Sequence, residues 1–91
     1  LGSQPPETPS IEVAHGGRGP IRVDVDPGKG RFSSIIVQSH GEWLWKTEIH
    51  PGTTRQLSVP RSYRGTPPKE LRIITVSSTG IESAPAVWRA K

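Results

Sequence analysis

The sequence of 91 residues contains no cysteine. This absence excludes a disulfide scaffold, a thiolate zinc site, a thiol nucleophile and an iron–sulfur cluster. No apolar run approaches the roughly 18 residues that a membrane-spanning helix requires, so we expect no membrane insertion. A basic segment followed by an apolar one is also missing at the amino terminus, and we expect no signal peptide within these residues.

Glycine and proline are abundant, with ten of each, and both destabilise long helices. A chain of this length buries only about 60–65% of its unfolded surface, which leaves a thin core and little room for a substrate pocket of about 300 Å³. The sequence also lacks Gly-x-Ser-x-Gly, a phosphate-binding Gly-x-x-x-x-Gly-Lys-Ser/Thr and a dinucleotide-binding Gly-x-Gly-x-x-Gly. We therefore predict a protein that is not an enzyme and needs no cofactor.

Apolar residues recur with period two, as in β-strands whose successive side chains point to opposite faces. The clearest case is residues 21–26, where apolar and charged residues alternate strictly. Residues 32–38 and 71–76 are apolar on both faces, which indicates central strands. Turn residues separate seven predicted strands at residues 11–14, 21–26, 32–38, 42–49, 57–59, 71–76 and 84–90.

Strands spaced about ten residues apart predict an all-β fold, a seven-stranded antiparallel β-sandwich. We assign residues 10–91 to this domain. Residues 1–9 are rich in proline and read as an interdomain linker, in which Leu1-Gly2-Ser3 is alternatively a cloning remnant.

The carboxyl-terminal segment, residues 70–88, resembles the F–G hairpin of fibronectin type III domains. Its apolar strand leads into the turn Thr79-Gly80-Ile81-Glu82-Ser83-Ala84-Pro85, which fits the Gly-x-x-Ser and proline pattern of that family. A proline-rich entry, the alternation of Ile11 and Val13, and residues 53–59 are similar to its linker, strand A and strand E.

The sequence also departs from this family. The tryptophan usual on strand B is replaced by Ile21, Val23 and Val25, and Leu71 or Ile73 stands where strand F carries a tyrosine. A related immunoglobulin-like sandwich is therefore the alternative fold.

The resemblance implies a non-catalytic accessory module of a larger extracellular or surface protein. Such a module spaces, supports or contacts a neighbouring domain, which in bacteria is commonly a polysaccharide hydrolase. Its partners would be neighbouring domains, with a glycan or a protein as a further ligand. We expect no nucleic acid partner, and we expect the isolated domain to be monomeric.

Two tryptophans, Trp43 and Trp45, share one predicted face of the segment 42–49, and the opposite face is charged except for Leu44. Because Ile49 shares their predicted face, we expect both indoles to pack in the core. The alternative is an exposed aromatic platform on which sugar rings stack.

Basic residues are concentrated in the segment 51–72, which carries five cations and one carboxylate, whereas residues 1–50 carry a net charge of −1. We favour a solvated loop whose arginines neighbour the acidic first half. The alternative is a binding surface for carbohydrate or another polyanion. The candidate contact residues of both alternatives are Trp43, Trp45, Arg55, Arg61, Tyr63, Arg64 and Lys69.

The other titratable clusters predict no chemistry. His15, His40 and His50 fall in predicted loops without the spacing of metal ligands, so we expect solvated turn histidines and no metal. Asp24 and Asp26 share one strand face, which we predict to be solvated rather than a calcium or acid–base site.

Overall fold

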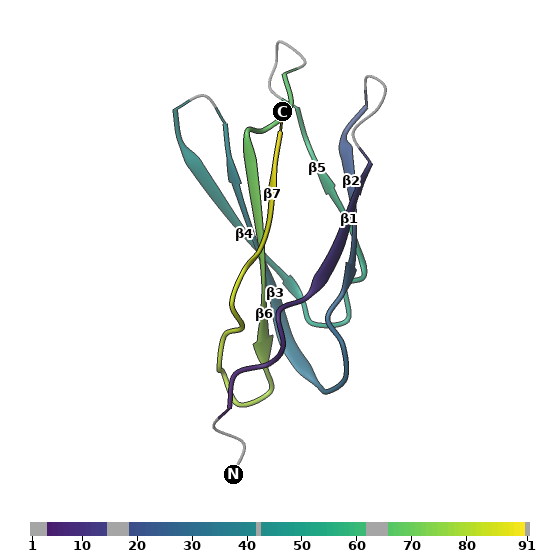
Figure 1. Cartoon of the computed structure of the whole chain (residues 1–91), viewed down its shortest axis with the longest axis vertical. Coiled ribbons are helices and arrows are strands. Elements are labelled where there is room, and N and C mark those ends of the chain that lie inside the picture. Colours follow the sequence, from purple (N-terminus) through teal and green to yellow (C-terminus); the bar gives the residue numbers. More distant parts are fainter. Residues whose placement is uncertain (1–3, 15–18, 42, 62–65, 91) are drawn as a thin grey trace.

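The computed structural model describes residues 4–14, 19–41, 43–61 and 66–90. These residues form strands and connecting turns, with no helix among them (Figure 1). The strands are β1 (Ser10–Ala14), β2 (Ile21–Asp26), β3 (Phe32–His40), β4 (Trp45–Pro51), β5 (Gln56–Val59), β6 (Glu70–Ser77) and β7 (Ala86–Arg89).

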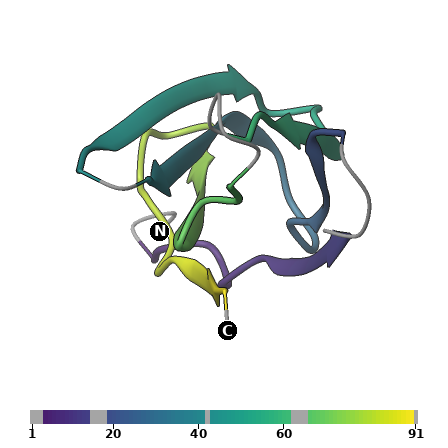
Figure 2. The same cartoon turned by 90° about the horizontal axis from the view of Figure 1, so that it is seen from above.

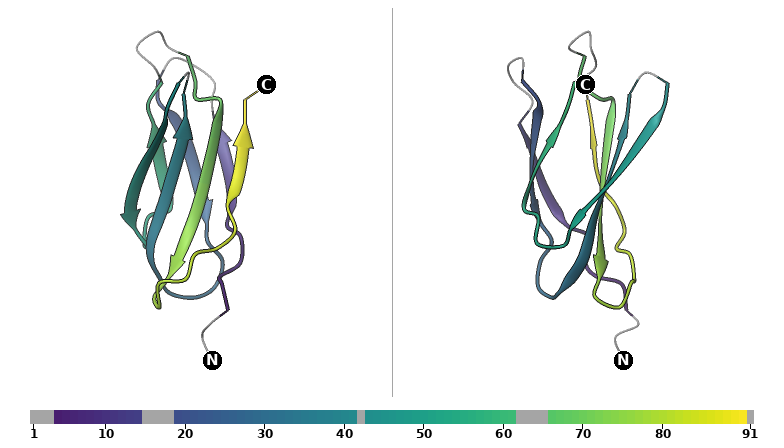
Figure 3. Two further views of the ribbon diagram at one scale, coloured as in Figure 1. Left: turned by 90° about the vertical axis from the view of Figure 1, so that its left-hand side faces the viewer. Right: turned by 180° about the vertical axis from the view of Figure 1, so that it is seen from behind.

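The strands make two antiparallel sheets, one of three strands in the order β1-β2-β5 and one of four in the order β4-β3-β6-β7. Figure 2 looks along the long axis and shows the two sheets around a common interior. Figure 3 shows the same two layers from the side and from behind. The predicted all-β architecture of two packed antiparallel sheets is therefore confirmed.

Alternation along each strand produces the core between the sheets. In β2 the apolar residues are buried and the charged ones exposed, as the period-two pattern predicts. The inner face of the four-stranded sheet adds Ile35, Val37, Leu71 and Ile73, and Leu57 and Val59 of β5 complete the opposite layer. As predicted from their two apolar faces, β3 and β6 are the central strands of the larger sheet.

Strand β4 differs most from the prediction. It begins at Trp45 rather than at residue 42, because the amide of Gly41 donates to the carbonyl of Leu44 (3.1 Å) and closes a turn. It lies at the edge of the larger sheet and pairs only with β3, and six of its seven residues are exposed. The three-stranded sheet therefore leaves this strand uncovered.

The connection from β4 to β5 turns at Gly52, whose amide donates to the carbonyl of Ser33 (3.2 Å). This glycine is buried, and a Cβ atom there would overlap the backbone carbonyl of Phe32. The close approach of two backbones explains why the turn requires glycine.

The sandwich is elongated, with Cα extents of 47 × 22 × 21 Å. Its first described residues and the end of β7 lie at opposite ends of the long axis (Figure 1). The β3–β4 turn and the connection from β5 to β6 both lie at the end where β7 finishes (Figure 1).

Candidate ligand-contact site

At this end of the sandwich an open pocket of about 260 Å³ lies between the β3–β4 turn and the β5–β6 connection. Its apolar lining consists of Trp43, Leu44, Pro60, Pro67 and Pro68. Its polar lining consists of Ser39, Gly41, Lys46, Arg61, Thr66 and Lys69. We call this feature the Trp43 pocket.

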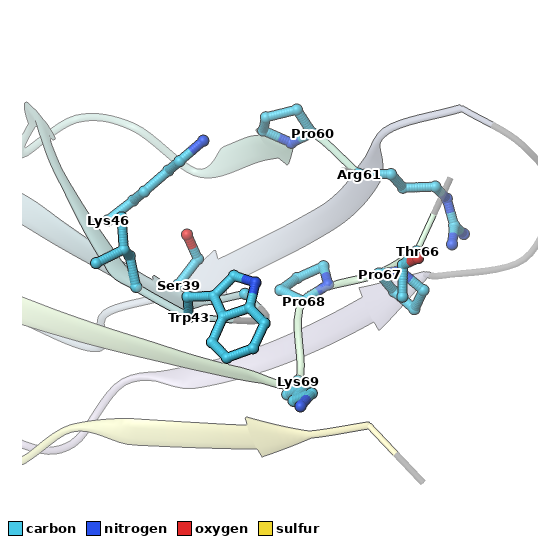
Figure 4. Close-up of a pocket in the computed structure, with 11 residues that line it drawn as sticks. Ser39, Trp43, Lys46, Pro60, Arg61, Thr66, Pro67, Pro68 and Lys69 are labelled. Atoms are coloured by element: carbon cyan, nitrogen blue, oxygen red, sulfur yellow. The ribbon is translucent and has the colours of Figure 1, made fainter. Parts of the chain in front are cut away.

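Trp43 lies in the turn before β4 and is 86% exposed, so its indole is accessible to a ligand. Figure 4 shows the indole beside Pro68, which is buried and therefore fixed. The turn itself is closed by the hydrogen bond between Gly41 and Leu44. A flat aromatic surface thus stands beside rigid proline rings.

Backbone hydrogen bonds hold the floor of the pocket at Lys69. Its amide donates to the carbonyl of His40 (2.8 Å), and its carbonyl accepts from the amide of Ala90 (2.9 Å). These bonds extend the β3–β6–β7 hydrogen-bond ladder by one residue, to Lys69, which directly precedes the first residue of β6. Lys69 is therefore anchored through its backbone while its side chain stays exposed.

Arg61 joins the pocket to the other sheet. Its Nε donates to the carbonyl of Gly19, just before β2, at 3.0 Å. Figure 4 shows Arg61 and Lys46 extending from opposite sides of the pocket. Among its described lining residues, three are cations and none is a carboxylate, so the electrostatic potential favours an anionic ligand.

The expected core packing of Trp43 and Trp45 is wrong. Trp45 is 44% exposed, and neither belongs to the buried core. The two tryptophans also do not share a face. Lys46 lines the pocket together with Trp43. Because successive residues of a strand point to opposite faces, Trp45, which precedes Lys46 in β4, points away from the pocket. The physical reason is that β4 is an uncovered edge strand.

Of the other candidate contact residues that the structure describes, neither Trp45 nor Arg55 lines this pocket. Arg55 donates through Nη1 to the carbonyls of Gly52 (2.8 Å) and Thr54 (3.0 Å), so it braces the β4–β5 turn. Tyr63 and Arg64 lie outside the described residues. The pocket therefore brings together Trp43, Arg61 and Lys69 of the predicted set.

Several pocket residues were not predicted, namely Leu44, Lys46 and the prolines at 60, 67 and 68. The prolines and Lys46 come from segments far apart in the sequence, and only the crossing between the two sheets brings them together. A run of Pro67-Pro68 before a strand was the one local signal of a rigid wall.

The histidines also differ from the prediction. His40 lies in β3, is half-buried and stacks on Trp45 with ring centroids 4.7 Å apart, and His50 lies in β4 with Nε2 3.4 Å from a carboxylate oxygen of Glu48. His15 lies outside the described residues. Within the described ranges, no three histidine, aspartate or glutamate residues gather in a way that could hold a metal ion.

The strand face that carries Asp24 and Asp26 is exposed, as predicted. Asp24 accepts a hydrogen bond from Nε2 of Gln56 (3.1 Å), and Asp26 accepts one from the amide of Gly28 (3.0 Å). The first contact joins the paired strands β2 and β5 and the second lies within the turn after β2, so the carboxylates serve the sheet and its turn.

The chain matches no protein-family model, and a comparison with curated proteins finds no significant match. Over the ranges that the structure describes, there is no helix long and apolar enough to cross a membrane.

Proposed function

We propose that this chain is a non-catalytic, fibronectin type III-like module of a larger extracellular or surface protein, and that its Trp43 pocket binds an acidic ligand. The ligand class that fits best is a carbohydrate carrying carboxylates. The observation that carries this proposal is an exposed indole beside rigid prolines in a pocket rimmed by three cations.

The strand order supports the type III-like assignment. Constant-type immunoglobulin domains place the fourth strand beside the fifth, in a four-stranded ABED sheet. Here β4 pairs with β3 in the other sheet, which leaves β1-β2-β5 as a three-stranded layer. This order distinguishes the chain from the constant-type pattern while keeping the two-layer architecture.

The chemistry of the pocket supports an acidic sugar. The apolar face of a sugar ring can stack on the indole of Trp43, as aromatic side chains do with flat partners. The ammonium groups of Lys46 and Lys69 then favour a carboxylate at the rim. Because the pocket is open and Lys46 and Lys69 are exposed, the binding should be weak and should decline as salt screens the charges.

The test is a titration of the isolated chain with an oligogalacturonate and with a neutral oligosaccharide of equal length, followed by tryptophan fluorescence and amide shifts. We expect saturable shifts at residues 43–46 and 69 with the acidic chain only. Trp43→Ala should weaken binding at least fivefold, and Lys46→Gln with Lys69→Gln should do the same. Lys29→Gln, an exposed lysine of the β2–β3 turn, is the matched control and should bind normally.

A second function, a spacer between neighbouring domains, is supported by the shape. The two ends of the described chain lie at opposite ends of the 47 Å axis, so domains attached there would be held apart (Figure 1). Replacing residues 10–91 by a flexible linker in a longer chain should change the interdomain distance in solution scattering. An unchanged distance and unchanged stability would exclude the spacer role.

A further inference from the structure

The outer face of the four-stranded sheet carries apolar side chains that nothing in the described chain covers. The register aligns Ile49 of β4 with Ile36 of β3, and Ile36 with Ile74 of β6. Ile49 is 70% exposed and the other two are half-buried. We call these three residues the outer isoleucine row.

A second row of aligned residues crosses the same face further along the strands. It aligns Trp45, His40, Glu70 and Arg89 on β4, β3, β6 and β7 in that order. Between the two rows, Gln38 aligns with Thr47 and with Arg72, and Arg72 aligns with Val87. The face therefore combines aliphatic residues with a tryptophan and arginines, and the last two residue types are enriched at protein interfaces.

The indole of Trp45 is held against this face by two side chains. His40 stacks on it at 4.7 Å with an interplanar angle of 23°, and the guanidinium carbon of Arg72 lies 4.7 Å from a ring centroid. These supports come from β3 and β6, and the Trp45 side chain still remains 44% exposed. An aromatic anchor held in this way loses little side-chain entropy on binding.

We propose that this face pairs with the same face of a second copy of the chain, forming a two-fold symmetric dimer. The two-fold axis would run parallel to the strands, between β3 and β6 and midway between the two facing sheets. Interfaces of this kind are self-complementary, because each surface patch meets its own counterpart. Aligned sheets can pack in this way at about 10 Å.

The register makes the two faces complementary under this axis. The rotation leaves each row at the same level along the strands and reverses the strand order. As a result, β3 faces β6 of the second copy and β4 faces β7. Ile36 then faces Ile74 of the second copy, and Ile49 flanks this pair, at the level where β7 of the second copy has not yet begun. Trp45 faces Arg89 of the second copy, so the partly exposed indole meets a guanidinium group. Thr47 likewise faces Val87 of the second copy.

The charges are compatible with this arrangement. Glu70 accepts hydrogen bonds from Nε of both Arg72 (2.7 Å) and Arg89 (2.8 Å), which leaves a cluster with a net charge of +1 on one side of the face. The axis places the cluster of the second copy on the opposite side. The two Arg89 residues are then three strand spacings apart laterally, about 14 Å, beyond the Debye length of about 8 Å in physiological salt.

This proposal differs from the monomeric state expected from the sequence. The sequence pattern separately predicts that Trp45 packs in the core on the same strand face as Ile49, whereas both side chains are exposed on the outer face. The interface is small, so the dissociation constant should be on the order of 100 µM. It uses neither Trp43 nor the Trp43 pocket, and it does not depend on the ligand proposed above.

The test is sedimentation equilibrium of the isolated chain between about 10 µM and about 1 mM, a range that brackets this dissociation constant. We expect the weight-average mass to rise from the 9.9 kDa of the monomer towards twice that value. Ile49→Glu should keep the monomer mass throughout. Ser58→Glu, at an exposed strand position of the opposite sheet, is the matched control and should dimerise like the unmodified chain.

Complementation tests the geometry of the pairing. Trp45→Ala and Arg89→Ala should each weaken dimerisation about tenfold, because each removes both Trp45–Arg89 contacts of a homodimer. In a mixture of the two variants, the heterodimer retains one intact contact. We expect it to form more tightly than either variant homodimer, with circular dichroism showing that both variants are folded.

A monomer mass at about 1 mM for the unmodified chain would overturn the proposal and would leave the face to a different protein. Dimerisation that survives Ile49→Glu would overturn it as well, because another surface would then be responsible. An equal or weaker association in the mixture of variants would overturn the two-fold pairing of Trp45 with Arg89.

Discussion

The guanidinium carbon of Arg72 lies 4.7 Å from the centroid of a Trp45 ring, so a cation from a central strand meets the one tryptophan of the edge strand β4. Nε of Arg72 also donates to a carboxylate oxygen of Glu70 at 2.7 Å, which fixes the guanidinium. The indole thus takes a defined position although β4 has no covering layer. This contact links β4 to β6, a strand other than its neighbour β3.

We predict measurable coupling between these two residues. Cation–π contacts at partly exposed sites contribute about 0.5–1 kcal/mol, so a double-mutant cycle of Trp45→Ala and Arg72→Met should give a coupling of that size in the free energy of unfolding. The measurement is urea denaturation at low protein concentration, where the chain is monomeric. Additive effects of the two substitutions would show that the contact contributes nothing.

Much of the fold could be predicted from the sequence because strand patterns are local. The alternation of residues 21–26 identified the buried residues of β2, and two apolar faces identified β3 and β6 as central strands. Alternation also separates the two faces of residues 42–49, but it does not indicate which face is covered. That depends on the neighbouring layer, which is why Trp45 and Ile49 were wrongly assigned to the core.

The candidate site could be predicted only in part. Arg61 and Lys69 were identified from the concentration of basic residues in the segment 51–72. Trp43 was identified only through the alternative prediction of an exposed aromatic platform. Their proximity depends on the crossing of the chain from β5 to β6 and on the closure of the turn at Gly41. Neither feature has a local sequence pattern strong enough to show which side chains meet.

We predict an acid-dependent contribution to stability from Glu70. Hydrogen bonds from Arg89 and Arg72 hold the pKa of this carboxyl below its usual value of 4.5, the bond from Arg89 having the larger effect. Because the folded-state pKa is the lower one, the stabilisation is fully present above the unfolded pKa. It is lost as the pH falls through the folded value.

The measurement is the melting temperature of the unmodified chain and of Glu70→Gln from pH 7 to pH 3. The unmodified chain should melt higher at pH 6–7, and this advantage should shrink below about pH 4.5 as the carboxylate is protonated. Glu7→Gln, in the exposed segment before β1, is the control. A difference between the two chains that stays constant with pH would contradict the prediction.

We predict that Thr75→Val stabilises the fold. The Oγ1 atom of Thr75 is buried without a hydrogen-bond partner, although the amide of this residue donates to Oγ of Ser83 at 3.0 Å. A valine keeps the branched shape and removes the unsatisfied hydroxyl, so the free energy of unfolding should rise by about 1 kcal/mol. Thr53→Val, at an exposed turn position, should leave it nearly unchanged. A destabilised Thr75→Val would show that the hydroxyl is paired in solution.

We predict that Gly52→Ala is the most damaging single-methyl change in the described chain. The added Cβ would overlap the carbonyl carbon and oxygen of Phe32, which belong to backbone and cannot swing away as a flexible side chain does. To relieve the overlap, the turn must separate from β3 and weaken the bond from the Gly52 amide to the Ser33 carbonyl. The free energy of unfolding should fall by about 2–4 kcal/mol, within the range known for overpacking and lost buried hydrogen bonds. Gly41→Ala is the matched control, because a Cβ there meets no atom within 4 Å. Chemical denaturation of both variants decides the prediction, and equal stabilities would contradict it.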